Sequence, residues 1–266
     1  MSAAPMLGIT MGDPSGIGPE IIAKTLAEMS LAERSRSAVI GNFGRLERAD
    51  KLLGTGLRFA LAPAEARDGA VPVFHVDTQG ADTMPDSKIS AAGGEAAYRF
   101  IVKAVELALA RRIAVIVTAP LNKAALHEAG HHFDGHTELL ATLTDTKQSW
   151  MLLASEKLSA IHVSTHTSLK NATERATTQR VLDTVRTGWK HYKALGIESP
   201  RIAVAGLNPH CGEGGIFGRE EIEQINAAVE LGAKEGMDVK GPISGDTVFY
   251  RATRGEFDLV VAQYHD

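Results

Sequence analysis

The stretch MLGITMGDPSGIGPE, residues 6–20, joins a short apolar run to a glycine-rich turn and the start of a helix. The run Met6–Thr10 is typical of a buried strand. Pro19 suits the first turn of a helix, and Glu20 is stabilised there by the positive end of the helix dipole. The stretch therefore predicts the strand–turn–helix unit from which α/β folds are built.

The glycines of this turn stand at positions 12, 16 and 18. This spacing is not the G-x-G-x-x-G of dinucleotide-binding folds, and no Lys-Ser/Thr pair follows, as a Walker loop requires. Glycines in such a turn either let backbone N–H groups approach an anion or serve close packing. The spacing slightly favours packing, and anion binding stays open as the alternative.

The alternation of strand and helix continues along the chain. Apolar and β-branched runs predict strands at Met6–Thr10, Ser37–Ile40, Val71–Val76, Ile113–Thr118, Leu158–Val163, Ile202–Leu207 and Leu259–Ala262. Apolar residues at helical spacing predict helices at Glu95–Arg111, Thr178–Leu195 and Glu220–Gly236. This order implies right-handed crossovers and largely parallel sheets covered by helices. The irregular stretch Gly130–Gly135 is the expected hinge between an α/β subdomain at 1–134 and a second one at 135–266.

Composition narrows the class of protein. The 266 residues carry 28 basic and 32 acidic side chains, a net charge of −4, so neither a nucleic acid nor a membrane surface is expected as a partner. The N-terminus lacks the pattern of a signal peptide, and no apolar run reaches the ~20 residues that span a bilayer. The single cysteine, Cys211, fits a reducing compartment. We therefore expect a cytoplasmic globular protein.

Polar, reactive side chains follow the ends of four expected strands. They lie in the segments Thr118–Lys123, Thr165–His166, Asn208–His210 and Gln263–Asp266. Open parallel sheets bind their ligands outside the carboxyl ends of the strands. We therefore expect these loops to line a shared cleft, although they are far apart in the sequence.

Three of these segments carry a histidine, namely His166, His210 and His265. Three neutral imidazoles with one open coordination position suit a catalytic zinc or a similar divalent ion. Their spacing matches no local metal motif, so structural histidines are an equal alternative. Asp246 and Asp266 are candidate acid–base groups or partners of the ligands, and turn-forming aspartates are the alternative for both.

Three local motifs are further candidates for a functional site. His127–His131 has the sequence HEAGH, which matches the H-E-x-x-H of zinc peptidases, but Gly130 costs about 1 kcal/mol inside the helix that this motif requires. Cys211 follows His210 directly and is expected to be a small packing residue, since no third group orients a Cys–His pair. His136 and Thr137 stand where a turn feeds a helix start, so they are candidates for binding a substrate oxyanion.

Seven motifs occur in order over nearly the whole chain: MGDPSGIGPE (11–20), TAPLNK (118–123), GHTE (135–138), STH (164–166), LNPHCGEGGIFGREE (207–221), GPISGDTVF (241–249) and YHD (264–266). Together they resemble the 4-hydroxythreonine-4-phosphate dehydrogenase (PdxA-like) family. The block from Leu207 to Glu221 is highly specific. Cys211, where many relatives have alanine, is the chief departure.

The resemblance implies a three-layer α/β/α fold like that of isocitrate and isopropylmalate dehydrogenases, in a homodimer with the active site between subdomains at the dimer interface. It implies one divalent metal per site (Zn, Mg or Co), held by the histidines that match His166, His210 and His265 and shared between subunits. The residues that match His136 and Thr137 bind substrate. The sequence stops at Asp266 inside the family's YHDQG motif, so we expect that a C-terminal segment supplying phosphate-binding residues is missing from it.

The implied chemistry is oxidation and decarboxylation of a phosphorylated 3-hydroxy acid with NAD or NADP. A divalent ion would stabilise the developing alkoxide and the enolate left by loss of CO₂. Asp246 and Asp266 are expected to position the metal or to move protons.

The leading substrate is 4-hydroxy-L-threonine 4-phosphate, in pyridoxal phosphate biosynthesis. The alternatives are 4-phospho-D-threonate or 4-phospho-D-erythronate in sugar-acid catabolism and, third, a cis-dihydrodiol in aromatic catabolism. A metallopeptidase using Glu128 and a non-catalytic metal- or phosphate-binding protein are the alternatives from other classes.

Overall fold

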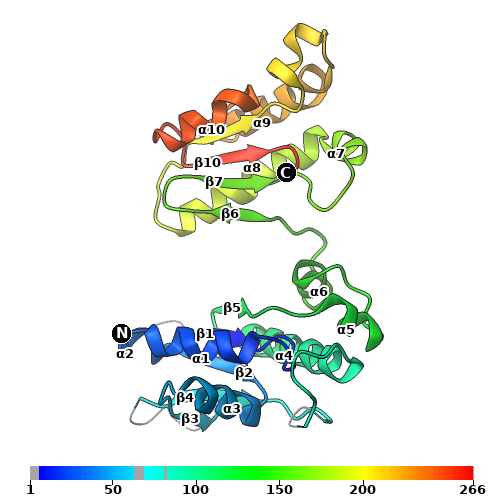
Figure 1. The fold of residues 1–266 in the computed structure, drawn as a ribbon. Coiled ribbons are helices and arrows are strands. Elements are labelled where there is room, and N and C mark those ends of the chain that lie inside the picture. Colours follow the sequence, from blue (N-terminus) through cyan, green and yellow to red (C-terminus); the bar gives the residue numbers. More distant parts are fainter. Residues whose placement is uncertain (1–5, 63–68, 81–82, 266) are drawn as a thin grey trace. The chain divides into compact units, whose positions relative to one another are not determined.

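The computed structural model describes residues 6–62, 69–80 and 83–265. The chain divides into two compact units, Met1–Ser149 and Trp150–Asp266, each a largely parallel sheet with helices around it (Figure 1). The predicted α/β class is confirmed. The division lies later than the expected boundary between residues 134 and 135, because the helix that starts at His136 packs on a long helix of the N-terminal unit.

The N-terminal unit is built on a five-stranded parallel sheet with the strand order β3-β4-β2-β1-β5. Its strands are β1 (Leu7–Thr10), β2 (Ser37–Gly41), β3 (Phe59–Leu61), β4 (Val71–His75) and β5 (Val115–Thr118). Buried apolar side chains such as Ile40, Val73 and Phe100 form one core between the sheet and its helices. β1 stands between β2 and β5, so the chain changes direction around it, which is the usual place of a ligand site in such sheets.

Several helices of this unit begin where a polar side chain caps the first free N–H groups, although its first and last described helices have no side-chain cap. Asn42, Ser90 and Asn122 each accept a hydrogen bond from a backbone N–H three residues later. The helices are α1 (Gly18–Glu28), α2 (Leu31–Arg34), α3 (Phe43–Leu53), α4 (Ala91–Leu109), α5 (Lys123–Glu128) and α6 (His136–Leu143). A side chain at Gly94 would overlap the carbonyl oxygen of Ala125, so this glycine permits the close contact of α4 with α5.

The C-terminal unit has the strand order β6-β7-β10-β8-β9, with only β6 antiparallel among its described strands. The strands are β6 (Leu152–Ala154), β7 (Ser159–His162), β8 (Ile202–Ala205), β9 (Val239–Ile243) and β10 (Leu259–Ala262). The helices are α7 (Leu169–Arg175), α8 (Thr178–Ala194), α9 (Asn226–Lys234) and α10 (Gly245–Thr253). The alternation along β10 separates two cores: Leu259 and Val261 pack with α8 and α9, whereas Val260 packs with α10. The sheet is therefore covered on both faces.

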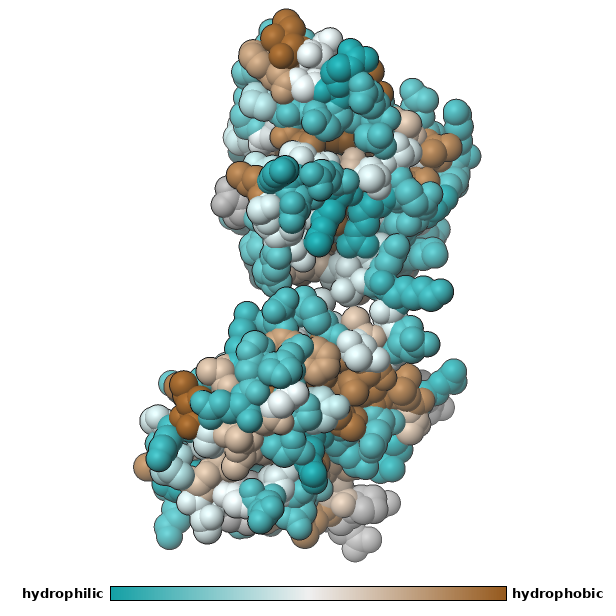
Figure 2. Space-filling view, turned by 90° about the vertical axis from the view of Figure 1, so that its right-hand side faces the viewer, coloured by the Kyte–Doolittle hydropathy of each residue, from teal (hydrophilic) through white to brown (hydrophobic). Residues whose placement is uncertain are grey.

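The predicted helix at 220–236 is divided in the structure. A π-helical turn, Glu221–Ile225, precedes α9. The strands β3, β6 and β9 were not predicted, and each of them lies at an edge of its sheet. Hydrophilic residues predominate on the faces of the two units in Figure 2, and none of the described helices is long and apolar enough to cross a membrane.

Candidate functional site

Three of the predicted site histidines follow three neighbouring strands. β7, β10 and β8 are adjacent in the sheet, and His166, His265 and His210 stand in the loops at their carboxyl ends. The rings of His166 and His265 have their centroids 6.0 Å apart at 72°. His210 lines a hollow of about 300 Å³ together with Asp246 and Tyr264. The carboxyl edge of this sheet therefore carries three of the four predicted polar segments, whereas the fourth, Thr118–Lys123, follows β5 in the N-terminal unit.

The backbone at two of these histidines is in the left-handed region. The φ angle is 47° at His166 and 51° at His210. His210 opens a run of six residues with positive φ that ends at Gly215. A left-handed conformation costs roughly 1–2 kcal/mol at a residue other than glycine. Strain of this kind gathers at functional sites, where surrounding contacts enforce a side-chain direction that relaxed backbone does not give.

A buried carboxylate enforces the loop that carries His210. Glu221 is 2% exposed and accepts hydrogen bonds from the backbone N–H groups of Leu207 and Asn208, both at 2.7 Å. The amide of Asn208 donates to Glu221 at 2.9 Å and to Glu220 at 2.7 Å. The adjacent acids of the GREE motif are thus anchors of the NPH motif, a role that spacing alone did not predict.

His162 was missed as a site residue. It is the last residue of β7, 5% exposed, with its ring centroid 5.3 Å from that of His265. Its Nδ1 hydrogen-bonds the carbonyl oxygen of Met151 at 3.1 Å. Burial lowers the pKa of His162, so the ring is neutral at physiological pH. A histidine inside an apolar strand looks like a core residue in the sequence, and only the sheet order places it beside His265.

His162 also lines a second hollow at this edge, of about 410 Å³, with Phe249, Gln263 and Tyr264. Gln263 is 2% exposed and donates to the carbonyl oxygen of Ala205, while its Oε1 has no hydrogen-bond partner. The two hollows share Gly206, Gly245 and Tyr264. A polar ligand at this edge would find imidazole, phenol, carboxylate and amide groups around it.

Of the two predicted aspartates, Asp246 is among the residues that the structure describes. Asp246 is exposed in the first turn of α10 and lines the hollow of His210. Asp266 lies outside the described residues. Cys211 is half-buried, and burial raises the pKa of its thiol, which fits the predicted packing residue rather than a thiolate nucleophile.

His136 and Thr137 belong to the N-terminal unit, where they form the start of α6. Gly135 caps this helix without a side-chain hydrogen bond, so its first N–H groups are free of a side-chain cap. His136 is half-buried, burial lowers its pKa, and its buried Nε2 has no hydrogen-bond partner. This orphaned nitrogen beside a helix N-terminus is what a substrate-binding histidine requires.

The HEAGH segment does not form a peptidase site. Helix α5 ends at Glu128, and Gly130 with φ 87° turns the chain before His131. His131 instead hydrogen-bonds Glu95 at 2.7 Å, and His127 hydrogen-bonds the carbonyl oxygen of Phe133 at 3.2 Å. The two imidazoles therefore have separate structural partners and do not share one helical face.

The opening turn packs tightly. Asp13, 5% exposed, accepts a hydrogen bond from the N–H of Ser15 at 2.9 Å, and its own N–H donates to the carbonyl of Pro120. A side chain at Gly12 would overlap the carbonyl oxygen of Pro120. The glycine therefore serves close backbone approach between the loops after β1 and β5, as the packing interpretation predicts.

Metal binding by the three histidines rests on their donor chemistry, which suits a catalytic divalent ion. Over residues 6–62, 69–80 and 83–265, no three His, Cys, Asp or Glu side chains of one chain are grouped to hold an ion. The sharing of ligands between two subunits stays a prediction.

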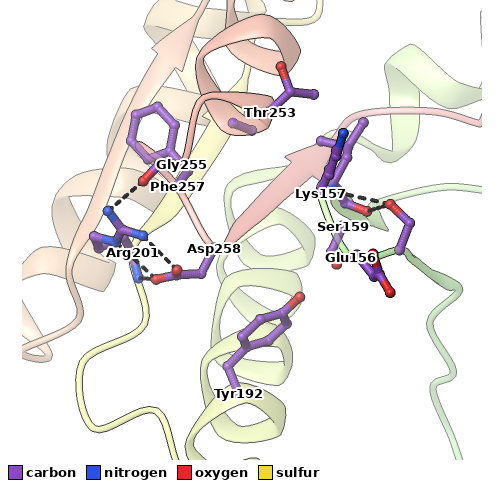
Figure 3. A pocket seen from close by; sticks show the side chains of 12 residues that line it. Glu156, Lys157, Ser159, Tyr192, Arg201, Thr253, Gly255, Phe257 and Asp258 are labelled. Atoms are coloured by element: carbon purple, nitrogen blue, oxygen red, sulfur yellow. Dashed lines mark hydrogen bonds and ion pairs between the residues drawn. The ribbon is translucent and has the colours of Figure 1, made fainter.

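A further cavity of about 370 Å³ lies at the opposite, amino edge of the C-terminal sheet (Figure 3). Arg201 lines this cavity, but the Arg201 guanidinium donates to the carboxylate of Asp258 at 2.7 Å and to the carbonyl oxygen of Gly255 at 2.7 Å. Tyr192 points toward it from α8 (Figure 3). None of the predicted site residues lines this cavity.

Comparison with known proteins agrees with the motifs. The model of the family described as "Pyridoxal phosphate biosynthetic protein PdxA" matches residues 33–266. D-threonate 4-phosphate dehydrogenase of Cupriavidus necator is 48% identical, with 98% of this chain and 80% of the relative covered. 4-Hydroxythreonine-4-phosphate dehydrogenase of Geobacter metallireducens is 40% identical, with 98% and 78% covered.

A solved structure is similar over the full chain. The crystal structure of a 4-hydroxythreonine-4-phosphate dehydrogenase from Burkholderia phymatum has a TM-score of 0.88 and 43% identity, covering 100% of this chain and 82% of that one. These relatives are all named dehydrogenases, the enzyme class that the motifs predict. The chain therefore belongs to the family of the pyridoxal phosphate biosynthetic protein PdxA.

Proposed function

We propose that the protein is an NAD- or NADP-dependent dehydrogenase that oxidises the 3-hydroxyl of a phosphorylated hydroxy acid and releases CO₂ from the product. The observation that carries the proposal is the placement of His166, His265 and His210 after three adjacent strands. The names of the relatives supply the reaction class. Loss of hydride from C3 gives a 3-keto acid, in which the C–C bond to the carboxylate breaks readily.

The first substrate to test is 4-phospho-D-threonate. The relative named for D-threonate 4-phosphate is 48% identical, against 40% for the one named for 4-hydroxythreonine 4-phosphate. 4-Hydroxy-L-threonine 4-phosphate is the second candidate, because the matching family model is described by pyridoxal phosphate biosynthesis. Both are phosphorylated 3-hydroxy acids, so one site chemistry serves either.

His166, His210 and His265 are the proposed holders of one divalent ion per site, zinc, magnesium or cobalt, with the ligands drawn from two subunits of a homodimer. A divalent ion supplies a Lewis acid that stabilises negative charge on substrate oxygen. The residues of the protein bind and orient the reacting groups. Glu221 fixes the loop of His210 through three hydrogen bonds, and His162 stands against His265 with a neutral ring.

We assign substrate binding to His136 and Thr137 and proton movement to Asp246. The unpartnered Nε2 of His136 and the free first turn of α6 can hold an anionic oxygen of the substrate. Asp246 is exposed beside His210, where its carboxylate can accept the proton that the substrate hydroxyl loses. The same role is proposed for Asp266.

The test is reduction of NAD⁺ and NADP⁺ at 340 nm by the purified protein with 4-phospho-D-threonate, 4-hydroxy-L-threonine 4-phosphate and unphosphorylated D-threonate. We expect turnover with a phosphorylated acid, loss of that turnover with a chelator, and recovery with one of the three ions. Chelator-insensitive turnover would exclude the metal role. Stoichiometric metal binding without reduction of either cofactor on any substrate would favour a non-catalytic binding protein.

A further inference from the structure

The HEAGH segment, which the proposed reaction does not use, makes a set of contacts with a long helix. His131 inserts between two residues of α4: its Nε2 donates to Glu95 at 2.7 Å, and its ring stacks on Tyr98 with centroids 3.6 Å apart and 11° between planes. The His131 side chain is 22% exposed and that of Glu95 38% exposed. The imidazole is therefore fixed both in the plane of its ring and across its face.

The same histidine fixes the chain around it. The N–H of His131 donates to the carbonyl of Leu126 at 3.0 Å, and the N–H of Phe133 donates to the carbonyl of His131 at 3.2 Å. His127 adds a hydrogen bond from its Nε2 to the carbonyl oxygen of Phe133. The loop 130–135 has no other secondary structure, so its path depends on these few contacts.

This loop ends where the candidate substrate residues begin. Gly135 is the N-cap of α6, and the N–H of Leu139 donates to its carbonyl oxygen at 3.3 Å. His136 and Thr137 follow at once. α4, in contrast, is a rigid base, because it is a 19-residue helix with nine buried residues. α6 packs on α4 as well, and the loop joins α4 to the first turn of α6 through Gly135, so the contacts of the loop with α4 add to the restraint on that turn.

We propose that His131, held between Glu95 and Tyr98, is a positioning residue that fixes the loop 130–135 on α4 and thereby sets the position of His136 and Thr137 for the substrate. The part that concerns substrate rests on the proposed function, whereas the restraint of the first turn of α6 does not. The negative charge of Glu95 strengthens its hydrogen bond with His131, and this hydrogen bond is the main cause that lowers the pKa of Glu95.

Amide hydrogen exchange of the substrate-free protein tests the restraint, with His131→Ala and the milder Glu95→Gln as variants. We expect exchange over residues 131–138 to become about tenfold faster in His131→Ala and to rise less in Glu95→Gln, with α8 unchanged. Arg99→Ala is the matched control, because Arg99 pairs with the same Glu95 at 2.6 Å through a side chain that is 55% exposed. Unchanged exchange in both variants, or an equal rise in Arg99→Ala, overturns the inference.

Kinetics with 4-phospho-D-threonate test the consequence for substrate. We expect His131→Ala to raise KM about tenfold, which corresponds to about 1.4 kcal/mol, and to change kcat by less than about threefold. Faster exchange with an unaltered KM overturns the positioning role. If the wild-type protein oxidises neither phosphorylated acid, the proposed function fails, and the exchange at His136 and Thr137 then decides the inference alone.

Discussion

Two glycine-rich loops stand at the carboxyl edges of the two sheets and use their glycines differently. The loop after β1 is closed by contact with the loop after β5: Asp13 is buried, and Gly12 allows the backbone to approach Pro120. In the loop after β8, the more open of the two, a left-handed run leaves His210 exposed, and Gly214 has open space around it, although Gly212 is buried close to the carbonyl oxygen of Gly218. Glycine content alone therefore does not mark a ligand site, and what the glycines make possible must be read from the contacts.

The first prediction compares the two uses by adding a methyl group to each loop. Gly12→Ala places Cβ on the carbonyl of Pro120 at φ 71°, so we expect the free energy of unfolding to fall by about 3–5 kcal/mol. Gly214→Ala, at φ 69° with no atom within 4 Å of the new Cβ, is expected to cost about 1 kcal/mol. Urea unfolding measures both. Equal losses would show that backbone conformation, not close approach, is what matters at Gly12.

The second prediction concerns the anchor of the open loop. Glu221→Gln puts an NH₂ group where a carboxylate oxygen accepts the amide of Asn208, so we expect a loss of about 1.5–3 kcal/mol and a drop in kcat/KM of about tenfold or more. Glu223→Gln is the control, since its side chain is 56% exposed in a surface pair with Arg219. Steady-state kinetics at equal folded fraction give the comparison. If the two variants are alike, Glu221 does not hold the loop of His210.

The sequence predicted the closed loop better than the open one. Pro19, Glu20 and the strand before them are local signals, and the turn follows from them. The open loop depends on long-range contacts: Glu221 reaches back to Leu207 and Asn208, and no propensity indicates left-handed backbone at His210. The same reason explains β9, where Gly241 and Pro242 interrupt the strand pattern and lie at a shift in the register with β8. It also explains His162, which sheet order alone brings to His265.

The third prediction uses pH to compare His136 in the N-terminal unit with His162 in the C-terminal unit. Burial lowers the pKa of both below the ordinary value of 6.5. Below pH 6.5 these histidines therefore bind more protons in the unfolded chain than in the folded chain. Their contribution to the free energy of unfolding is complete above pH 6.5 and is lost as the pH falls below that value. Each histidine contributes at most about 1.4 kcal/mol per pH unit.

The measurement is urea unfolding at pH 7.5 and pH 5.5. We expect His162→Asn to lose less stability on acidification than the wild-type protein, and His136→Asn to do the same in its own unit. Identical acid sensitivity of a variant and the wild-type protein would show that its histidine is not held neutral by burial.

The smallest expected effect belongs to Cys211. Burial raises the pKa of its thiol, so the group is protonated at neutral pH, and Cys211→Ala should change kcat/KM by less than about twofold. Initial rates of NAD⁺ reduction measure this. A loss beyond tenfold would reveal thiol chemistry in the open loop and contradict the packing role.

The central claim is that chemistry takes place at the histidine edge of the C-terminal sheet and not at the opening turn. Asparagine tolerates left-handed backbone, so His210→Asn removes the imidazole without adding strain, and Asp13→Asn changes the buried acid of the closed loop. Bound metal per chain and kcat/KM are measured for both variants. We expect His210→Asn to lose its metal and at least about a hundredfold in kcat/KM, while Asp13→Asn keeps both. Full metal content and turnover in His210→Asn, with loss in Asp13→Asn, would contradict the account.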